Sequence, residues 1–206
     1  GTTADPKGVI HTHDTLGADE ILAIERLDMT PDVKPFIPSP VTHITGVFKA
    51  LELPFVVGMS FVLMDEWDPE EAVQIIDNEE VTRTGGATPF IEGLLEAAPE
   101  DWDSTLELVS TGGAYVSPDL IRKAREAFGC PVTRGYGSTE YPGMAKTPLD
   151  ASPERGATTD GMLQKGTRVK IVDVETREAL PDGEEGEILV YGPNLMVGYN
   201  GSDLNQ

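Results

Sequence analysis

The run Cys130-Pro131-Val132-Thr133-Arg134-Gly135-Tyr136-Gly137-Ser138-Thr139-Glu140 places a short apolar segment directly before a glycine-rich turn. Glycines on both sides of Tyr136 let the backbone approach a ligand closely. The Tyr136 ring offers a flat face, Thr139 can donate a hydrogen bond, and Glu140 offers oxygen ligands to a hard cation such as Mg²⁺. The run therefore predicts either a site where a base, a phosphate and a metal meet, or only a strand-ending turn capped by Thr139 and Glu140.

Upstream of this turn, short apolar segments alternate with helical patterns of about ten residues, as expected for a parallel α/β layer. The expected strands are 9–13, 36–38, 55–58, 61–64, 81–84, 106–111 and the segment at Val132. The expected helices are 14–27, with Asp14 or Thr15 as its cap, 68–76, 88–95 and 117–128. The fold class predicted is a layered, mainly parallel sheet with flanking helices.

Ligands of such sheets collect at the carboxyl ends of the strands. Gly112-Gly113-Ala114, the Tyr136–Glu140 turn and His43 all follow expected strands, so we expect them at one edge. A lone histidine more often has a structural role, and that is the alternative for His43. Beyond residue 150 the helical pattern ends, and the strands expected at 169–173 and 187–191 are joined by a turn rich in Pro, Asp and Gly. We therefore expect an α/β unit over 1–150 and a β-rich unit, part of a barrel, over 151–206.

The first residues, Gly1-Thr2-Thr3-Ala4-Asp5-Pro6-Lys7-Gly8, could form a backbone nest for phosphate oxygens. Thr2 and Thr3 would add hydroxyl donors and Lys7 a mobile positive charge. The spacing is not that of the G-x-x-x-x-G-K-[ST] loop, since no Ser or Thr follows Lys7. A plain surface turn is the alternative.

The net charge of −21, from 15 basic and 36 acidic residues, is the unusual feature of the composition. Phosphate-backbone binding needs a clustered basic surface, and the sequence shows none, so we expect no nucleic-acid partner. The acidity fits either adaptation to high salt, where screening removes the repulsion, or an ordinary acidic cytoplasmic protein. The single cysteine, Cys130, suits a reducing cytoplasm, and no apolar run is long enough to span a membrane.

Taken together, four motifs resemble the adenylate-forming (AMP-binding) superfamily, which includes the acyl-CoA synthetases and ligases. They are Gly1–Val9, Gly112-Gly113-Ala114, Tyr136-Gly137-Ser138-Thr139-Glu140, and Gly186–Pro193 with Met196 and Gly198-Tyr199. Their order and spacing match that family over essentially the whole chain. The segments Val62–Glu70 and Gly86–Pro89 are most similar to the medium-chain and aryl branch.

The resemblance implies activation of a carboxylic acid with ATP to an acyl-adenylate, followed by transfer of the acyl group to coenzyme A. It implies that Thr2, Thr3, Lys7 and Gly8 hold the phosphates, that Gly113 and Ala114 line adenine, and that Tyr136 packs on its ring beside Gly137 and Ser138. Thr139 would contact phosphate, Glu140 would bind Mg²⁺, and His43 would stand near the acyl carboxylate. Gly85, Gly86 and Gly135 would border an acyl pocket wide enough for an aromatic, branched or medium-length acid.

The sequence also departs from the family pattern. Ala4 replaces a usual glycine, and the Thr-Gly-Asp that would hold ribose and the later catalytic Lys are absent. We therefore expect an internal fragment of the large domain, with little ligase activity by itself and with exposed sheet edges that invite self-association. Two alternatives stay open: a nucleotide-binding module without chemistry, and an adenylation domain that loads a carrier protein instead of CoA.

Overall fold

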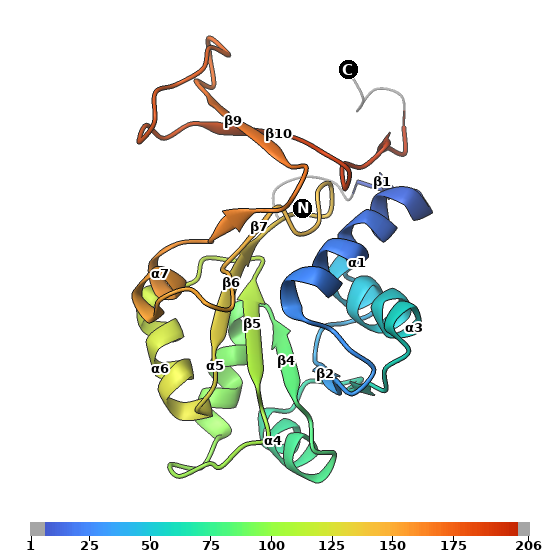
Figure 1. Cartoon of the computed structure of the whole chain (residues 1–206), viewed down its shortest axis with the longest axis vertical. Coiled ribbons are helices and arrows are strands. Elements are labelled where there is room, and N and C mark those ends of the chain that lie inside the picture. The colour runs from blue at the N-terminus through green and yellow to red at the C-terminus, as the bar shows by residue number, and fades with distance from the viewer. Residues whose placement is uncertain (1–6, 202–206) are drawn as a thin grey trace.

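The computed structural model describes residues 7–201, and within them the main sheet has seven strands in the order β3-β2-β4-β5-β6-β7-β8 (Figure 1). The strands are β2 (Pro35–Ile37), β3 (Val62–Leu63), β4 (Arg83–Gly86), β5 (Leu108–Gly112), β6 (Val132–Tyr136), β7 (Ala145–Lys146) and β8 (Met162–Leu163). The pairs from β3 through β6 are parallel, and β7 and β8 add antiparallel pairs at one edge. The predicted α/β class is thus confirmed.

Helices α4 (Pro69–Asn78), α5 (Thr88–Ala97) and α6 (Pro118–Phe128) lie between successive parallel strands and cover one face of the sheet (Figure 1). Their starts are encoded locally. Asp68 caps α4 by accepting from the Glu71 amide at 2.9 Å, and Ser117 caps α6 by accepting from the Leu120 amide at 3.1 Å. Proline in the first turn of each helix costs no hydrogen bond there.

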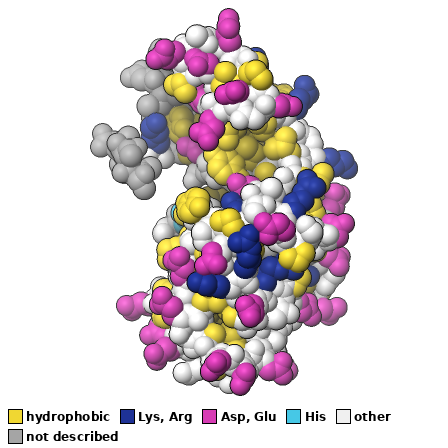
Figure 2. Space-filling view, turned by 90° about the vertical axis from the view of Figure 1, so that its left-hand side faces the viewer, with side chains coloured by type: hydrophobic (Ala, Val, Ile, Leu, Met, Phe, Trp, Pro, Cys, Tyr) yellow, Lys and Arg dark blue, Asp and Glu magenta, His cyan; other side chains and the backbone are white. Residues whose placement is uncertain are grey.

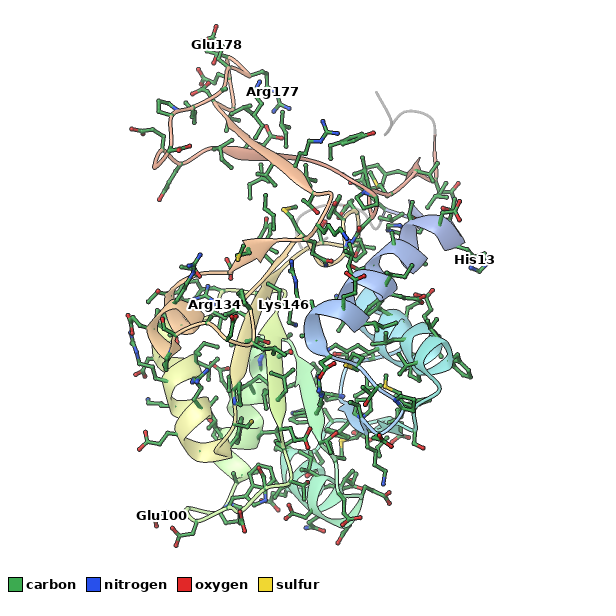
Figure 3. The ribbon with its side chains drawn as sticks, viewed as in Figure 1. His13, Glu100, Arg134, Lys146, Arg177 and Glu178 are labelled. Atoms are coloured by element: carbon green, nitrogen blue, oxygen red, sulfur yellow. The ribbon has the colours of Figure 1, made fainter. Side chains whose placement is uncertain are left out.

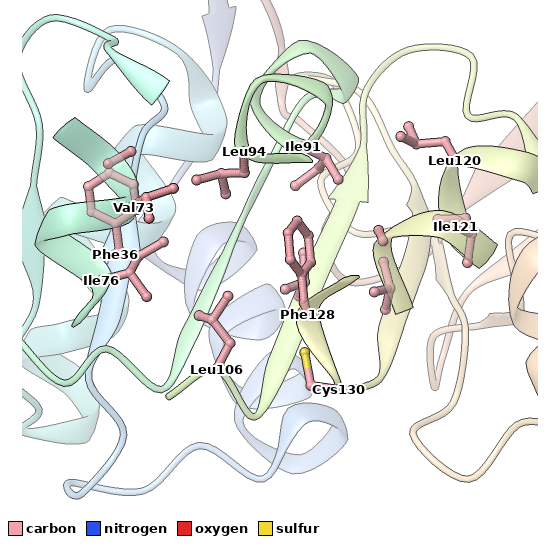
Figure 4. Packing of buried hydrophobic residues seen from close by; sticks show 14 of the residues in the cluster. Phe36, Val73, Ile76, Ile91, Leu94, Leu106, Leu120, Ile121, Phe128 and Cys130 are labelled. Atoms are coloured by element: carbon pink, nitrogen blue, oxygen red, sulfur yellow. The ribbon is translucent and has the colours of Figure 1, made fainter. Parts of the chain in front are cut away.

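The main hydrophobic core fills the layer between these helices and the sheet (Figure 4). Ile76, Ile91, Leu94 and Ile121 are completely buried in it. Cys130 belongs to the same core, and burial raises the pKa of its thiol to about 11, so this cysteine packs as a small apolar side chain. The core fixes the strands β4 to β6, whose ends carry the candidate site.

The opposite face of the sheet is covered by α1 (His13–Leu27), the π-helical turn η1 (Val47–Glu52) and α3 (Leu53–Val57), with α2 (Ile44–Gly46) leading into η1 (Figure 1). A smaller cluster of Val33, Leu53 and Met59 packs there. Helix α1 begins one residue before Asp14, because Thr12 is its cap and forms a capping box with Thr15. The expectation that Asp14 or Thr15 is the cap residue was wrong, although Thr15 contributes the second half of the box.

Residues 55–58 are not the strand that their apolar run predicted: Leu53–Val57 is helix α3. Pro54 suits the first turn of a helix, and Gly58 ends it in the left-handed conformation at φ 78°. A short apolar run does not distinguish a strand from a buried helix by periodicity alone. Helix α7 (Pro153–Thr158), capped by Ser152, was also not anticipated from the pattern beyond residue 150.

Beyond β8 the chain forms small antiparallel pairs. Strands β9 (Arg168–Val172) and β10 (Glu187–Tyr191) make a two-stranded sheet that projects from the body (Figure 1). Strand β11 (Gly198–Tyr199) pairs with β1 (Val9–Ile10), so the two ends of the described chain lie side by side. The two-stranded sheets agree with β-rich character, and β8 after residue 150 belongs to the main sheet. The division of the chain at residue 150 stays a prediction.

Charges on the α6 and α7 side of the molecule are mixed. Figure 2 shows basic side chains gathered at mid-height, between acidic side chains above and below. On helix α6, Lys123 pairs with Asp119 at 2.9 Å, and Arg122 pairs with Glu154 of α7 at 3.0 Å. Over residues 7–201, no helix is long and apolar enough to cross a membrane.

Candidate nucleotide and acid site

Two glycine turns lie next to each other at the carboxyl ends of β5 and β6. Gly112 and Gly135 are register partners, and a Cβ on Gly112 would come within 2.3 Å of the Gly135 carbonyl oxygen. Gly113 follows at φ 79°, a left-handed conformation that favours glycine. Gly113 and Ala114 are exposed, and so is the Tyr136 ring, at 45%. The expected adjacency of the two turns is confirmed, and their exposed surface can receive a flat ring.

The turn after Tyr136 is held by packing beneath it. The Ser138 amide donates to the Tyr141 carbonyl at 3.1 Å, and a Cβ on Gly137 would lie 2.7 Å from the Gly143 nitrogen. Tyr141 is buried, and its hydroxyl lies 2.8 Å from the Thr167 hydroxyl. The buried ring thus fixes the turn from below, while Ser138 and Thr139 remain exposed above.

Glu140 is the best-organised anionic group of this turn. The Tyr199 hydroxyl donates to its Oε1 at 2.8 Å, and the Lys7 ammonium lies 5.3 Å from the centre of the Tyr199 ring. Partial burial acts to raise the pKa of Glu140, but the backbone amide, the Tyr199 and Ser138 side chains and the charge of Lys7 outweigh it and hold the pKa below its ordinary value. Glu140 is therefore ionised at neutral pH.

Lys7 and Gly8 reach this turn through the pairing of β1 with β11. The Asn200 amide donates to the Gly8 carbonyl at 2.7 Å, and Val9 pairs with Tyr199. The structure thus brings Lys7, predicted to hold phosphate, to the side of Glu140, predicted to hold the metal. Thr2, Thr3 and Ala4 lie outside the described residues.

Thr139 is positioned by a residue that the sequence patterns did not single out. Nε2 of His11 lies 2.7 Å from the Thr139 carbonyl oxygen, and Nδ1 lies 3.0 Å from the Thr15 hydroxyl. Thr15 belongs to the capping box of α1, so the start of that helix and the turn of Thr139 are linked. His11 was expected only as a strand residue, and its short local motif gave no signal of this long-range contact.

His43 is the N-cap of α2. Its Nδ1 accepts from the Thr45 amide at 3.2 Å, and the side chain is exposed. The capping contact is the structural role that the sequence left open, and it leaves Nε2 directed away from that contact. His43 therefore stands at the entrance to η1 with one ring nitrogen available to a ligand.

Gly85 and Gly86 end β4, and Gly85 borders a pocket of about 60 Å³ on the α1 side of the sheet. A Cβ on Gly85 would lie 2.0 Å from the Ser110 carbonyl oxygen, so the strands approach too closely there for any other residue. Gly86 faces Phe90 and Ser39 instead. The pocket is mostly apolar, with walls from the sheet, α1, η1 and α3. Gly85 lines this pocket, whereas Gly86 and Gly135 do not. The assignment of these three glycines to an acyl pocket stays a prediction.

A buried polar cluster behind the turn also escaped the sequence analysis. Oδ1 of Asp19 accepts from Gln164 at 3.0 Å and from Asn194 at 2.6 Å, and Asn194 also donates to the Pro142 carbonyl at 3.1 Å. Burial raises the pKa of Asp19 to about 7, against the lowering effects of Gln164, Lys146 and Asn194. The cluster ties α1 to the segment that follows Glu140 and to the loop before β11.

Within residues 7–201 no group of three or more His, Cys, Asp or Glu side chains could hold a metal ion by itself. Mg²⁺ is commonly bound by one or two carboxylates together with substrate phosphates, so a single ionised carboxylate beside a phosphate site is a suitable donor set. Glu140 meets that description. The group of Lys7, Glu140, Tyr136 and Gly113 therefore fits a nucleotide with its metal.

Known proteins match both the sequence and the fold. The chain is 35% identical over 202 residues to a medium-chain fatty-acid–CoA ligase of Escherichia coli, covering 97% of this chain and 35% of that protein. A structure of ATP-bound MatB from Rhodopseudomonas palustris superposes with a TM-score of 0.88 at 27% identity, over 97% of this chain and 39% of that chain.

A structure of O-succinylbenzoate coenzyme A synthetase (MenE) from Bacillus subtilis, in complex with ATP and magnesium ion, has a TM-score of 0.86 at 28% identity, over 100% of this chain and 42% of that one. The chain thus spans well under half the length of each of these proteins. The AMP-binding enzyme family model matches residues 1–200. With the paired glycine turns, Tyr136 and Glu140 in place, this match establishes that the chain belongs to the AMP-binding enzyme family.

Proposed function

We propose that this chain forms the nucleotide- and acid-binding part of an ATP-dependent, AMP-forming acyl-CoA ligase. The observation that carries the proposal is the ionised Glu140, held by Tyr199 and flanked by Lys7, at the strand ends that present Gly113 and Tyr136. In this proposal the carboxylate of Glu140, the ammonium of Lys7 and the ring of Tyr136 surround the bound nucleotide. The likeness to CoA ligases and to structures solved with ATP supports the same assignment.

The first chemical step forms a bond between a carboxylate oxygen of the acid and the α-phosphorus of ATP, and breaks the bond from that phosphorus to the oxygen of the leaving pyrophosphate. The adenine ring packs on Tyr136 between Gly113 and Ala114, which fixes the α-phosphorus in the turn. Lys7 and the hydroxyl of Thr139 offset negative charge on the phosphates. Such catalysis depends mainly on positioning and on charge stabilisation.

Mg²⁺, when bound, would neutralise charge on the phosphate oxygens, and Glu140 is the residue that would hold it. The carboxylate of the acid lies near His43, with its apolar part in the pocket beside Gly85. In the second step the sulfur of coenzyme A bonds to the acyl carbon, and the bond from that carbon to the AMP oxygen breaks. We propose CoA as the acceptor thiol, with the thiol of a carrier protein as the alternative.

The test is acid-dependent exchange of pyrophosphate into ATP, measured on the full-length product of the coding sequence that contains residues 1–206. We expect exchange with a carboxylic acid panel, and a loss of about a hundredfold or more in kcat/KM for Glu140→Gln, which removes the metal-binding charge. Tyr136→Ala should raise the KM for ATP about tenfold, the equivalent of roughly 1.4 kcal/mol of ring packing.

Calorimetry with a non-hydrolysable acyl-adenylate analogue separates binding from chemistry. Tight analogue binding without any exchange would support the nucleotide-binding module instead of the ligase. Exchange followed by thioester formation with CoA supports the ligase, and thioester formation only with a phosphopantetheinyl carrier protein would move the proposal to carrier loading. Glu178→Gln, far from the turn and exposed, is the matched control for Glu140→Gln.

A further inference from the structure

Two lysines lie in the wall of the pocket beside Gly85. Lys49 comes from η1 and Lys146 from β7, and the side chains around them are largely apolar: Leu27, Met29, Phe36, Phe48, Leu53 and Met59. Figure 3 shows Lys146 between the β6–β7 side of the sheet and helix α1. The apolar part of an aliphatic or aromatic acid offers no partner to an ammonium group. Two lysines in this pocket therefore indicate a ligand with a further polar or charged group.

Neither lysine has an ionised partner among residues 7–201. Lys49 donates to the Gly85 carbonyl at 2.9 Å, and Lys146 takes part in no recorded ion pair or side-chain hydrogen bond there. Asp19 is the carboxyl that acts on Lys146, but Asp19 is itself buried and bonded to Gln164 and Asn194. The pocket therefore carries excess positive charge.

That charge is energetically unfavourable in the free protein. Burial lowers the pKa of Lys49 to about 8, and burial together with the charges of Lys49 and Arg26 lowers the pKa of Lys146 to about 7. Unpaired buried cations destabilise a fold relative to apolar side chains of the same size. An anion brought in by a ligand would offset this cost and restore both ammonium groups to their charged form.

The register of the sheet gives the depth of the lysines relative to the nucleotide turn. The Lys49 ammonium binds the carbonyl of Gly85, which is level with Ser110. Gly113 lies three residues further along the chain, a distance of about 10 Å at the rise of a strand. The Cα of Lys146 is level with Gly135, so its long side chain must reach down from the turn into the pocket.

Resting on the proposed ligase function, we propose that the acid accepted by this pocket carries a second anionic group, such as a second carboxylate, which Lys49 and Lys146 bind. The reacting carboxylate lies at the turn near Gly113 and His43. The second lies deeper, at the level of Gly85, and the connecting part of the substrate packs on the apolar wall. Arg83 also lines the pocket, and its guanidinium donates to the carbonyls of Leu27 and Asp28. Arg26 is not in the lining and donates to the carbonyls of Met162 and Leu163.

The test compares acids of matched length on the full-length product of the coding sequence that contains residues 1–206. Pyrophosphate exchange is measured for succinate, adipate and suberate against butyrate, hexanoate and octanoate. We expect at least one dicarboxylate to exceed its matched monocarboxylate by about tenfold or more in kcat/KM, the equivalent of one bound charge pair.

Lys49→Met and Lys146→Met remove the charges and keep an unbranched apolar side chain. Each should lower kcat/KM for the preferred dicarboxylate by about tenfold and leave or improve that for the monocarboxylate, which also shows that the variant folds. Lys170→Met, on the exposed side of β9, is the control and should change neither value.

The exchange assay distinguishes a failure of the ligase proposal from a failure of the dicarboxylate inference alone. No exchange with any acid overturns the ligase proposal and this inference with it. Exchange that favours monocarboxylates and keeps the same acid preference in both lysine variants overturns the inference alone. An equal loss for all acids in Lys146→Met would assign that lysine to the reacting carboxylate and would also overturn it.

A second measurement does not depend on turnover. Calorimetry of dicarboxylate binding in two buffers of different ionisation enthalpy, near pH 8, should show net proton uptake, because the bound anion returns the lysines to their charged form. Binding without proton uptake would contradict the assignment.

Discussion

The hydroxyl of Tyr199 donates a 2.8 Å hydrogen bond to Oε1 of Glu140, across 59 residues of sequence. Tyr199 belongs to β11, which pairs with β1, and β1 begins two residues after Lys7. The carboxylate that we assign to the metal is thus oriented by a strand pair that lies next to Lys7, the lysine that we assign to the phosphates. A change in the β1–β11 pair should therefore affect both Glu140 and Lys7.

Tyr199→Phe removes the hydroxyl and keeps the ring beneath Lys7. We expect the pKa of Glu140 to rise, because one of the groups that hold it down is lost, and nucleotide affinity in the presence of Mg²⁺ to fall about fivefold, for roughly 1 kcal/mol in a partly exposed hydrogen bond to a charge. Equilibrium binding of ATP with and without Mg²⁺ measures this change. Tyr191→Phe, exposed on β10, is the control, and equal affinities in the wild type and Tyr199→Phe would show that Glu140 is oriented without the hydroxyl.

The neighbouring glycines of the β5 turn should differ strongly when replaced by alanine. A Cβ at Gly113 meets nothing within 4 Å, so Gly113→Ala should cost only the left-handed backbone strain of φ 79°, about 1 kcal/mol. A Cβ at Gly112 would lie 2.3 Å from the Gly135 carbonyl oxygen, so β5 and β6 must separate. We expect Gly112→Ala to lower the free energy of unfolding by on the order of 3 kcal/mol or more. Urea denaturation compares the two, and equal costs would mean that the strands separate freely at the site.

The parts of this fold that could be predicted from sequence are those encoded locally. The β5 and β6 segments, the helix start at Asp68-Pro69 and the two glycine turns are set by neighbours within a few residues, so pattern and capping rules find them. The strand predicted at 55–58 was wrong, because apolar residues alone do not specify whether backbone hydrogen bonds form within the segment or with a neighbouring strand.

The contacts that complete the site are long-range, and no local pattern contains them. Asp19 meets Asn194 across 175 residues, and His11 meets Thr139 across 128. Lys49 and Lys146 lie in segments that match no motif. Their shared position becomes visible only in the fold, where η1 and β7 line one pocket. The turns that we assign to ligand binding are therefore predictable from this sequence. The residues that orient those turns, and the lysines that we propose to select the acid, are not.

The acidic surface predicts a stability that depends on salt. At a net charge of −21, mutual repulsion opposes the folded state at low ionic strength, and added salt shortens its range. We expect the urea midpoint to rise from low to molar KCl. Glu178→Gln, Glu184→Gln and Glu185→Gln together remove three exposed charges near β10 and should reduce that rise. An unchanged midpoint across the salt series would reject adaptation to high salt.

We expect Asp19 to make the free energy of unfolding depend on pH, and we expect Asp19→Asn to abolish its share of that dependence. Its pKa is raised by burial from 3.8 to about 7 in the folded protein, with Gln164, Lys146, Asn194 and Glu20 also acting on it. Between about pH 4 and pH 7 the folded protein therefore holds a proton that the unfolded chain has released. The contribution of Asp19 to the free energy of unfolding falls as pH rises through that window and is constant above it, by at most about 4 kcal/mol.

Asp19→Asn cannot ionise, yet its Oδ1 can still accept from Gln164 and Asn194. Relative to the wild type, the variant should therefore gain stability between about pH 4.5 and pH 8, as measured by urea denaturation at both values. Asp182→Asn, in the exposed turn before β10, should run parallel to the wild type. Asp19→Ala should be less stable at both pH values, because Gln164 and Asn194 lose their acceptor. Parallel curves for Asp19→Asn and the wild type would show that Asp19 ionises in the folded state as readily as in the unfolded chain.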